Sequence, residues 1–149
     1  MITFDFVPLH QVGHEIAPNV ERHYSEMSDG DDYGIPQIDW DSYIAASHIG
    51  LCRVVTVRDE GELVGYAVYS IGRNLRYKNR IEASSDGVFL EKPYRGKLSN
   101  ELLNMADKFL SELGIHETNY ILSDDRVGKL LGRKGYKSKY KIWSKIYGK

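Results

Sequence analysis

The stretch from Asp86 to Gly114 combines a strand end, a basic turn and a helix start, a combination that binds anions. Residues 88–90 are the apolar end of an expected strand, and a proline and Gly96 mark a turn directly after it. Arg95 and Lys97 add two positive charges to that turn. The following helix directs its free N–H groups and the positive end of its dipole at the same place. The sequence therefore predicts an anion-binding site between strand and helix.

The helix after this turn has to pack on the rest of the protein in order to position the site. Its apolar residues recur at helical spacing and mark one buried face: Leu98, Leu102, Leu103, Ala106, Phe109, Leu110 and Leu113. Gly114 follows as a C-terminal stop. The pattern predicts an amphipathic helix that begins at the basic turn and packs on a core.

At these residues the chain resembles the GCN5-related N-acetyltransferase (GNAT) superfamily. Members carry a pyrophosphate-binding motif, Arg/Gln-x-x-Gly-x-Gly/Ala, after their fourth strand, often preceded by an apolar triplet, an acidic residue, Pro and Tyr. Residues 89–97 follow that lead-in, but Leu98-Ser99-Asn100 stands where the family usually has Gly-x-Gly. Glycines let the backbone approach the pyrophosphate without an intervening Cβ. The resemblance implies acetyl-CoA as co-substrate, bound by Phe89, Leu90, Arg95, Gly96, Lys97, Leu98, Ser99 and Asn100.

The expected order of elements along the chain is β-α-α-β-β-β-α-β-α-β, which is also the GNAT order. The strands are expected over residues 2–9, 51–58, 63–71, 80–90, 117–122 and 136–147, and the helices over 11–27, 40–49, 98–113 and 126–133. Asp39 is the expected N-cap of the second helix, and Pro18 is expected to break or kink the first. We predict a mixed α/β sheet in a single GNAT-like domain spanning residues 1–149.

The pattern is also similar to GNAT-type proteins encoded by bacteriophages and bacteria. These share the Asn-Leu-x-Tyr link that occurs here at Asn74, Leu75 and Tyr77. The segment 125–136 looks like the closing helix of the family.

Composition predicts a globular, cytoplasmic protein. Of 149 residues, 42% are hydrophobic and 28% charged. The single cysteine, Cys52, excludes an intramolecular disulfide. No apolar run approaches the length of a membrane span, and the N-terminus lacks the basic start of a signal peptide. The five histidines have no carboxylate pattern of metal ligands around them, so no metal site is expected.

Charge is distributed unevenly along the chain. Residues 1–50 carry nine acidic residues and one basic residue, whereas residues 126–149 carry nine basic residues and no acidic one. The resemblance implies that the first two helices and the loop between them form part of the acceptor wall. Acidic residues together with Tyr33 and Trp40 there favour a cationic acceptor, such as a lysine of a protein or a small amine.

Amide acetylation needs a route for the amine proton and an acid for the departing thiolate. The candidate base is Asp86, just upstream of the cofactor site, and Glu82 on the same strand is the second candidate. The family often uses a tyrosine of the closing helix as the acid, but Leu131 occupies the matching position. Tyr120 and Tyr136 are near in sequence without matching the motif.

Two other functions remain open from the sequence. A catalytically weak or inactive GNAT-fold protein, used in phage assembly, would explain the altered turn and Leu131. Nucleic-acid binding would explain the basic C-terminal region, in which lysines alternate with Tyr136, Tyr140, Trp143 and Tyr147. An exposed last strand could also pair with a partner and form a homodimer.

Overall fold

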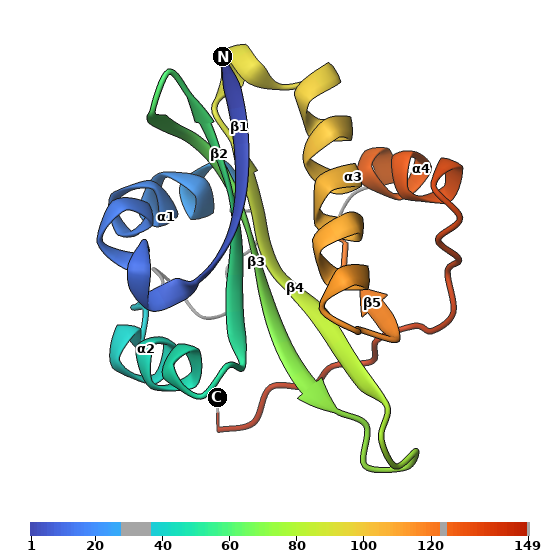
Figure 1. Ribbon diagram of the computed structural model, residues 1–149. Helices are drawn as coiled ribbons and strands as arrows, with labels where there is room; N and C mark the ends of the chain where they lie inside the picture. Colours follow the sequence, from blue (N-terminus) through green and yellow to red (C-terminus); the bar gives the residue numbers. More distant parts are fainter. Residues whose placement is uncertain (28–36, 123–124, 149) are drawn as a thin grey trace.

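The computed structural model describes residues 1–27, 37–122 and 125–148, and it contains a five-stranded mixed sheet (Figure 1). The strands are β1 (Ile2–Pro8), β2 (Cys52–Asp59), β3 (Glu62–Arg73), β4 (Ile81–Leu90) and β5 (Glu117–Asn119), and they lie in sequence order. The first four pair antiparallel, and β5 pairs parallel to β4. This arrangement confirms the expected α/β class and the expected mixed sheet.

Helices cover both faces of the sheet. The described residues contain the α-helices α1 (Gly13–Met27), α2 (Trp40–His48), α3 (Lys97–Glu112) and α4 (Asp125–Arg133). A 3-10 turn precedes α1, η1 (Leu9–Gln11), and another lies between β4 and α3, η2 (Lys92–Tyr94). Figure 1 shows α1 and α2 on one side of the sheet and α3 and α4 on the other. Among the described residues, no helix is both long and apolar enough to span a membrane.

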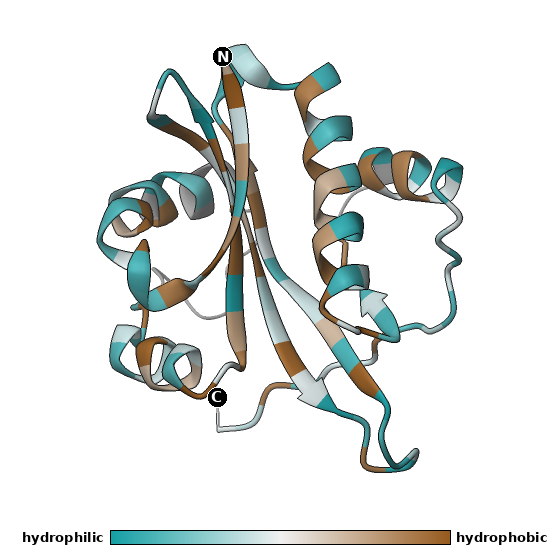
Figure 2. Cartoon of the chain, in the orientation of Figure 1, coloured by the Kyte–Doolittle hydropathy of each residue, from teal (hydrophilic) through white to brown (hydrophobic). Residues whose placement is uncertain are grey.

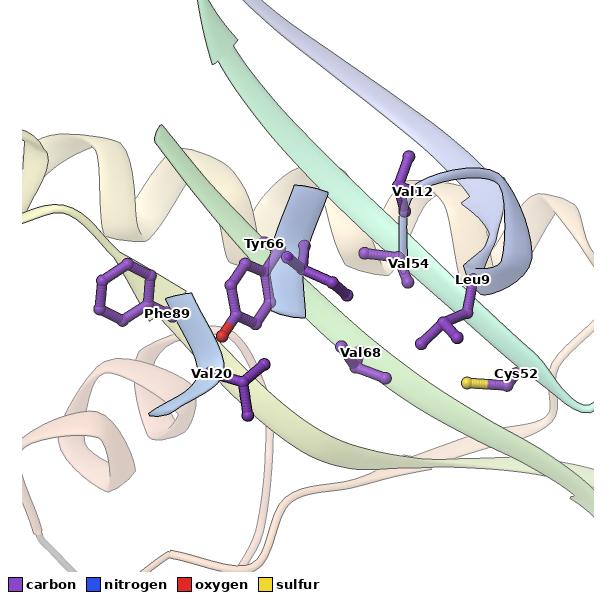
Figure 3. Packing of buried hydrophobic residues seen from close by; sticks show 9 residues of the cluster. Leu9, Val12, Val20, Cys52, Val54, Tyr66, Val68 and Phe89 are labelled. Carbon is purple, nitrogen blue, oxygen red and sulfur yellow. The ribbon is translucent and has the colours of Figure 1, made fainter. Parts of the chain in front are cut away.

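The side chains of the central strands alternate between two apolar clusters, because successive residues of a strand point to opposite faces. Figure 2 shows hydrophobic residues along these strands. One cluster packs η1 and α1 on the sheet through Leu9, Val12, Ile16, Val20, Cys52, Val54, Tyr66, Val68 and Phe89 (Figure 3). The other packs α3 on the opposite face through Val55, Val57, Val64, Ala67, Tyr69, Ala83, Leu102, Ala106 and Leu110. The expected buried stripe of α3 is therefore present, except at Leu113, which follows the helix and is exposed.

The start of α2 confirms the predicted cap. The Asp39 carboxylate accepts a hydrogen bond from the Ser42 N–H at 3.1 Å, which satisfies a donor that the first turn leaves free. The hydrogen bond from the Ser42 hydroxyl, followed by this backbone hydrogen bond, lowers the pKa of Asp39. In α1, by contrast, the helix continues through Pro18 without interruption. Pro18 is exposed, so its ring does not disturb the packed face.

The predicted last strand over residues 136–147 is wrong, because residues 136–148 form neither strand nor helix. The segment has the alternating pattern of a strand, but a strand also needs a partner with free N–H and C=O groups. The neighbouring edge strand, β5, is only 3 residues long, so it cannot pair with a segment of this length.

Gly65 allows the end of β4 to lie close to β3. A Cβ built at Gly65 would lie 2.5 Å from Leu90 Cδ1 and 2.8 Å from the Phe89 carbonyl oxygen. The carbonyl belongs to the backbone and cannot move away without shifting β4. We expect Gly65→Ala to lower the free energy of unfolding by about 1–3 kcal/mol, measured by urea denaturation.

Gly72 on the same strand is the matched control for this substitution. A Cβ there meets no atom within 4 Å, so Gly72→Ala is expected to change the free energy of unfolding by less than about 0.5 kcal/mol. Equal stability of the two variants would contradict the close approach of β3 and β4.

Candidate functional site

The site lies where β4 and β5 separate. These strands pair only through Glu82–Ser84 and Glu117–Asn119, and among the described residues no strand accompanies the rest of β4 on that side. A cavity of about 650 Å³ occupies the resulting gap. It is lined by the end of β4, by residues 120–122 after β5, and by side chains from all four helices. The two parallel strands thus diverge, and the cavity between them is large enough for a ligand.

The cavity walls are mostly apolar and aromatic. Helices α1 and α2 contribute Ile16, Val20, His23, Trp40 and Tyr43, and helices α3 and α4 contribute Leu102, Leu103, Val127 and Leu130. Of the two residues predicted to contact the acceptor, Trp40 lines the cavity, and Tyr33 lies outside the described residues.

Asp86 enters this apolar space because of a β-bulge. Val68 of β3 pairs with Gly87, and the next residue, Tyr69, pairs with Ser85, so Asp86 is an extra residue on β4. Bulges redirect side chains in this way. Asp86 lines the cavity and accepts a hydrogen bond from the Tyr43 hydroxyl. Burial, with a smaller contribution from the Asp86 charge, raises the pKa of Cys52 to about 11.

Glu82, the second candidate base, lies at the other end of β4 and is not among the residues lining the cavity. Its carboxylate accepts a hydrogen bond from the Asn74 amide at 2.5 Å and lies 3.9 Å from Arg80. Asn74 also accepts hydrogen bonds from the backbone N–H groups of Arg76 and Tyr77. The Asn-Leu-x-Tyr link therefore forms a turn between β3 and β4. The contacts of Glu82 with Asn74 and Arg80 stabilise this turn and lie away from the cavity.

Two arginines lie at the end of the cavity formed by α3 and α4. Arg95 lines it together with Arg126. The Arg95 Nε donates to the Leu90 carbonyl at 2.7 Å, and the guanidinium lies 5.8 Å from the centre of the Phe89 ring. Arg95 is therefore held across the end of β4, close to the start of α3.

The first turn of α3 retains free donors despite the altered motif. Gly96 has φ of 103°, a conformation that suits glycine, and its N–H donates to Ser99 Oγ at 3.3 Å. The backbone N–H groups of Lys97 and Leu98 make no hydrogen bond to another described residue. Such groups at a helix start are available to an anion.

The eight predicted cofactor residues divide into two groups. Phe89, Leu90, Arg95 and Ser99 line the cavity, whereas Gly96, Lys97, Leu98 and Asn100 surround the turn without lining it. The Lys97 side chain is 92% exposed, and Leu98 packs on the core beneath α3.

A tyrosine network absent from the sequence motifs also reaches the cavity. Tyr120, directly after β5, lines the cavity, and its hydroxyl lies 2.5 Å from that of Tyr69. The Tyr136 ring packs edge-on against the Tyr120 ring with their centres 5.5 Å apart, and the Tyr136 hydroxyl donates to Asp107 of α3. Burial, followed by the proximity of Tyr69, raises the pKa of Tyr120 well above 10. A half-buried, neutral phenol therefore lines the cavity.

Leu131, at the position where the family has its tyrosine, is buried and does not line the cavity. Sequence reasoning assigned no role to Tyr120 and missed Tyr43 and His23, because their positions follow no motif and depend on how distant elements meet. The one available signal for Tyr120 was its place in the expected strand over residues 117–122, of which only Glu117–Asn119 form a strand. Among the described residues, no three metal-ligating side chains come together.

Comparison with known proteins identifies the fold. No family model matches the chain, and no curated protein matches its sequence. Solved structures do match it over nearly its whole length. A ribosomal-protein-alanine N-acetyltransferase from Brucella melitensis biovar Abortus 2308 has a TM-score of 0.72 at 14% identity, covering 99% of this chain and 100% of that one.

Two further structures extend this likeness. The aminoglycoside acetyltransferase HMB0005, from an uncultured soil metagenomic sample, has a TM-score of 0.75 at 10% identity, covering 99% of each chain. A glucosamine-6-phosphate N-acetyltransferase from Arabidopsis thaliana has a TM-score of 0.64 at 15% identity, covering 98% of this chain and 99% of that one. The chain therefore has the fold of the GCN5-related N-acetyltransferases.

Proposed function

We propose that this protein transfers an acetyl group from acetyl-CoA to a primary amine. The observation that carries the proposal is the cavity between β4 and β5, which combines a carboxylate with two arginines and a helix start. An apolar, aromatic-lined space with a few polar groups is typical of a small-molecule site. The acetyltransferases that share the fold support this assignment.

In this proposal, the cofactor lies along the end of β4. The free N–H groups at the start of α3 and the Arg95 guanidinium bind the pyrophosphate, because both offer donors to negatively charged oxygens. The backbone from Gly87 to Leu90 binds the pantetheine arm. The side chains of Leu98, Ser99 and Asn100 leave the pyrophosphate less room to approach the backbone than the glycines of the family motif do. The affinity for acetyl-CoA therefore depends more on Arg95.

Asp86 and Tyr120 supply the proton transfers. Asp86 accepts the proton of the incoming ammonium, whose free amine then attacks the thioester carbonyl. The C–S bond breaks, and the thiolate takes a proton from the Tyr120 hydroxyl. The second proton that the nitrogen loses on becoming an amide passes through water and restores that hydroxyl. Tyr120 suits this role because burial keeps it neutral, so that a proton is available to donate.

The acceptor is proposed to be a cationic amine, either a small molecule or a lysine of a protein. Asp86 attracts positive charge, and Trp40 and Tyr43 offer aromatic faces next to it. The proteins with this fold act, by their names, on ribosomal-protein alanine, aminoglycosides and glucosamine 6-phosphate. A cytoplasmic location fits a single cysteine that remains a buried thiol.

Calorimetric titration with acetyl-CoA tests the proposal. We expect binding with a micromolar Kd, weakened about tenfold by Arg95→Ala, which removes a charged hydrogen-bond donor. Lys92→Ala is the matched control, because Lys92 is an exposed cation of η2 that does not line the cavity. It is expected to leave the Kd within twofold. A folded wild-type protein that does not bind acetyl-CoA would rule out the enzyme.

Free CoA released from acetyl-CoA can then be measured with a thiol reagent in a panel of amines. The only cysteine, Cys52, is 2% exposed, and burial raises its pKa to about 11. The protein itself therefore contributes little background. Aminoglycosides, amino sugars and lysine- or alanine-terminated peptides make up a suitable panel.

A further inference from the structure

The C-terminal segment 137–148, termed here the tail, exposes large aromatic side chains. It follows α4 as an irregular extended segment and ends below α2 in Figure 1. Tyr140, Trp143 and Tyr147 are 86%, 91% and 81% exposed, and Ile142 and Ile146 are exposed as well. None of these residues lines the cavity. Three exposed rings within eight residues leave substantial apolar area in water, which indicates a binding surface.

The tail is also uniformly basic. It contains Lys137, Lys139, Lys141 and Lys145 and no acidic residue. Lys139 pairs with Glu117 of β5 at 2.7 Å and holds the start of the tail on the sheet edge. No described acidic side chain lies within ion-pair distance of the other three lysines. Lys145 lies 5.4 Å from the centre of the Tyr147 ring, which places a cation beside an aromatic face.

We propose that the tail binds single-stranded nucleic acid. Lysines that lack acidic partners neutralise phosphates, and exposed rings stack on bases, which is the combination that single-strand-binding surfaces use. Unpaired bases are needed, because bases within a duplex are stacked on each other and offer no free face. The charge of the tail complements a polyanion along its whole length. This activity is separate from acetyl transfer, because the tail lies outside the cavity.

Trp143 provides a direct test. The chain has two tryptophans, so Trp40→Phe leaves Trp143 as the single reporter. We expect oligothymidylate of about twelve residues to quench Trp143 fluorescence and to bind with a micromolar Kd at about 50 mM NaCl. Neutralisation of three to four phosphates predicts a slope of about −2 to −3 for log K against log salt concentration.

Variants of the full-length chain separate stacking from charge. Trp143→Ala, measured by anisotropy of labelled oligothymidylate, is expected to weaken binding about 5- to 100-fold without changing the salt slope. Lys141→Ala with Lys145→Ala is expected to reduce the slope by about 1.4. The control pair, Arg76→Ala with Lys78→Ala, removes two exposed cations from the β3–β4 turn and is expected to leave binding unchanged.

Three outcomes would overturn the proposal. The first is the absence of oligothymidylate binding at low salt by the folded protein. The second is self-association: a Trp143 emission that shifts with protein concentration alone, together with a dimer in sedimentation that Trp143→Ala dissociates, would show that the tail binds a second copy instead. The third is equal affinity for duplex and single strand, which would exclude base stacking.

Discussion

Asp86→Asn is expected to lower kcat for amine-dependent CoA release by about 10²- to 10³-fold, because the amide cannot accept the ammonium proton. The substitution keeps the size of the side chain, and the amide oxygen can still accept the hydrogen bond of Tyr43. The Kd for acetyl-CoA, measured by calorimetry, should therefore stay within about twofold. A loss confined to kcat would distinguish proton transfer from binding.

Glu82→Gln provides the control on the same strand. Its carboxylate lies with Arg80 and Asn74 at the far end of β4, outside the cavity, so kcat is expected to change less than about twofold. The two sequence-derived base candidates thus give opposite expectations. A large loss of kcat in Glu82→Gln, or an unchanged kcat in Asp86→Asn, would refute the role proposed for Asp86.

Tyr120→Phe is expected to lower kcat by about 10- to 100-fold, because the ring remains but the proton for the departing thiolate is gone. Wild-type kcat should not fall between about pH 7 and pH 9 through ionisation of Tyr120, because burial raises its pKa above 10. The free energy of unfolding of the variant should also be lower by about 1–2 kcal/mol, since the fully buried Tyr69 loses its hydrogen-bond partner.

Tyr69→Phe separates the chemical from the structural effect. Tyr69 is 0% exposed and is not among the residues lining the cavity, so it cannot reach a substrate. It shares the same hydrogen bond with Tyr120, so its removal also perturbs the network. Kinetics at a temperature well below both unfolding midpoints should show a loss of kcat for Tyr120→Phe alone. An equal loss in both variants would assign the effect to disruption of the network.

The fold followed from the sequence because local signals and chain order agreed. The hairpin strands, the N-cap at Asp39 and the amphipathic stripe of α3 each depend on residues that are near neighbours in the chain. The turn from β4 into α3 was visible for the same reason, since a proline, Gly96 and Arg95 lie within four residues. These features predicted where an anion would bind.

The proposed catalytic end of the site depended on contacts between distant segments. Asp86 faces the cavity because a bulge sets the register of β4 against β3, and Tyr43 reaches it from 43 residues away. Tyr120 joins the cavity only because β4 and β5 separate after three paired residues. The separation of two strands leaves no periodic pattern of residues in the sequence.

For the tail, the local pattern gave a wrong prediction. Its alternating pattern is typical of a strand, but a strand exists only where a partner edge offers hydrogen bonds, and β5 is 3 residues long. The sequence by itself thus determined the elements and the basic turn, through local pattern and turn chemistry. The tertiary structure alone decided which carboxylate and which tyrosine meet in the cavity, and left the aromatic residues of the tail exposed, because these depend on strand pairing.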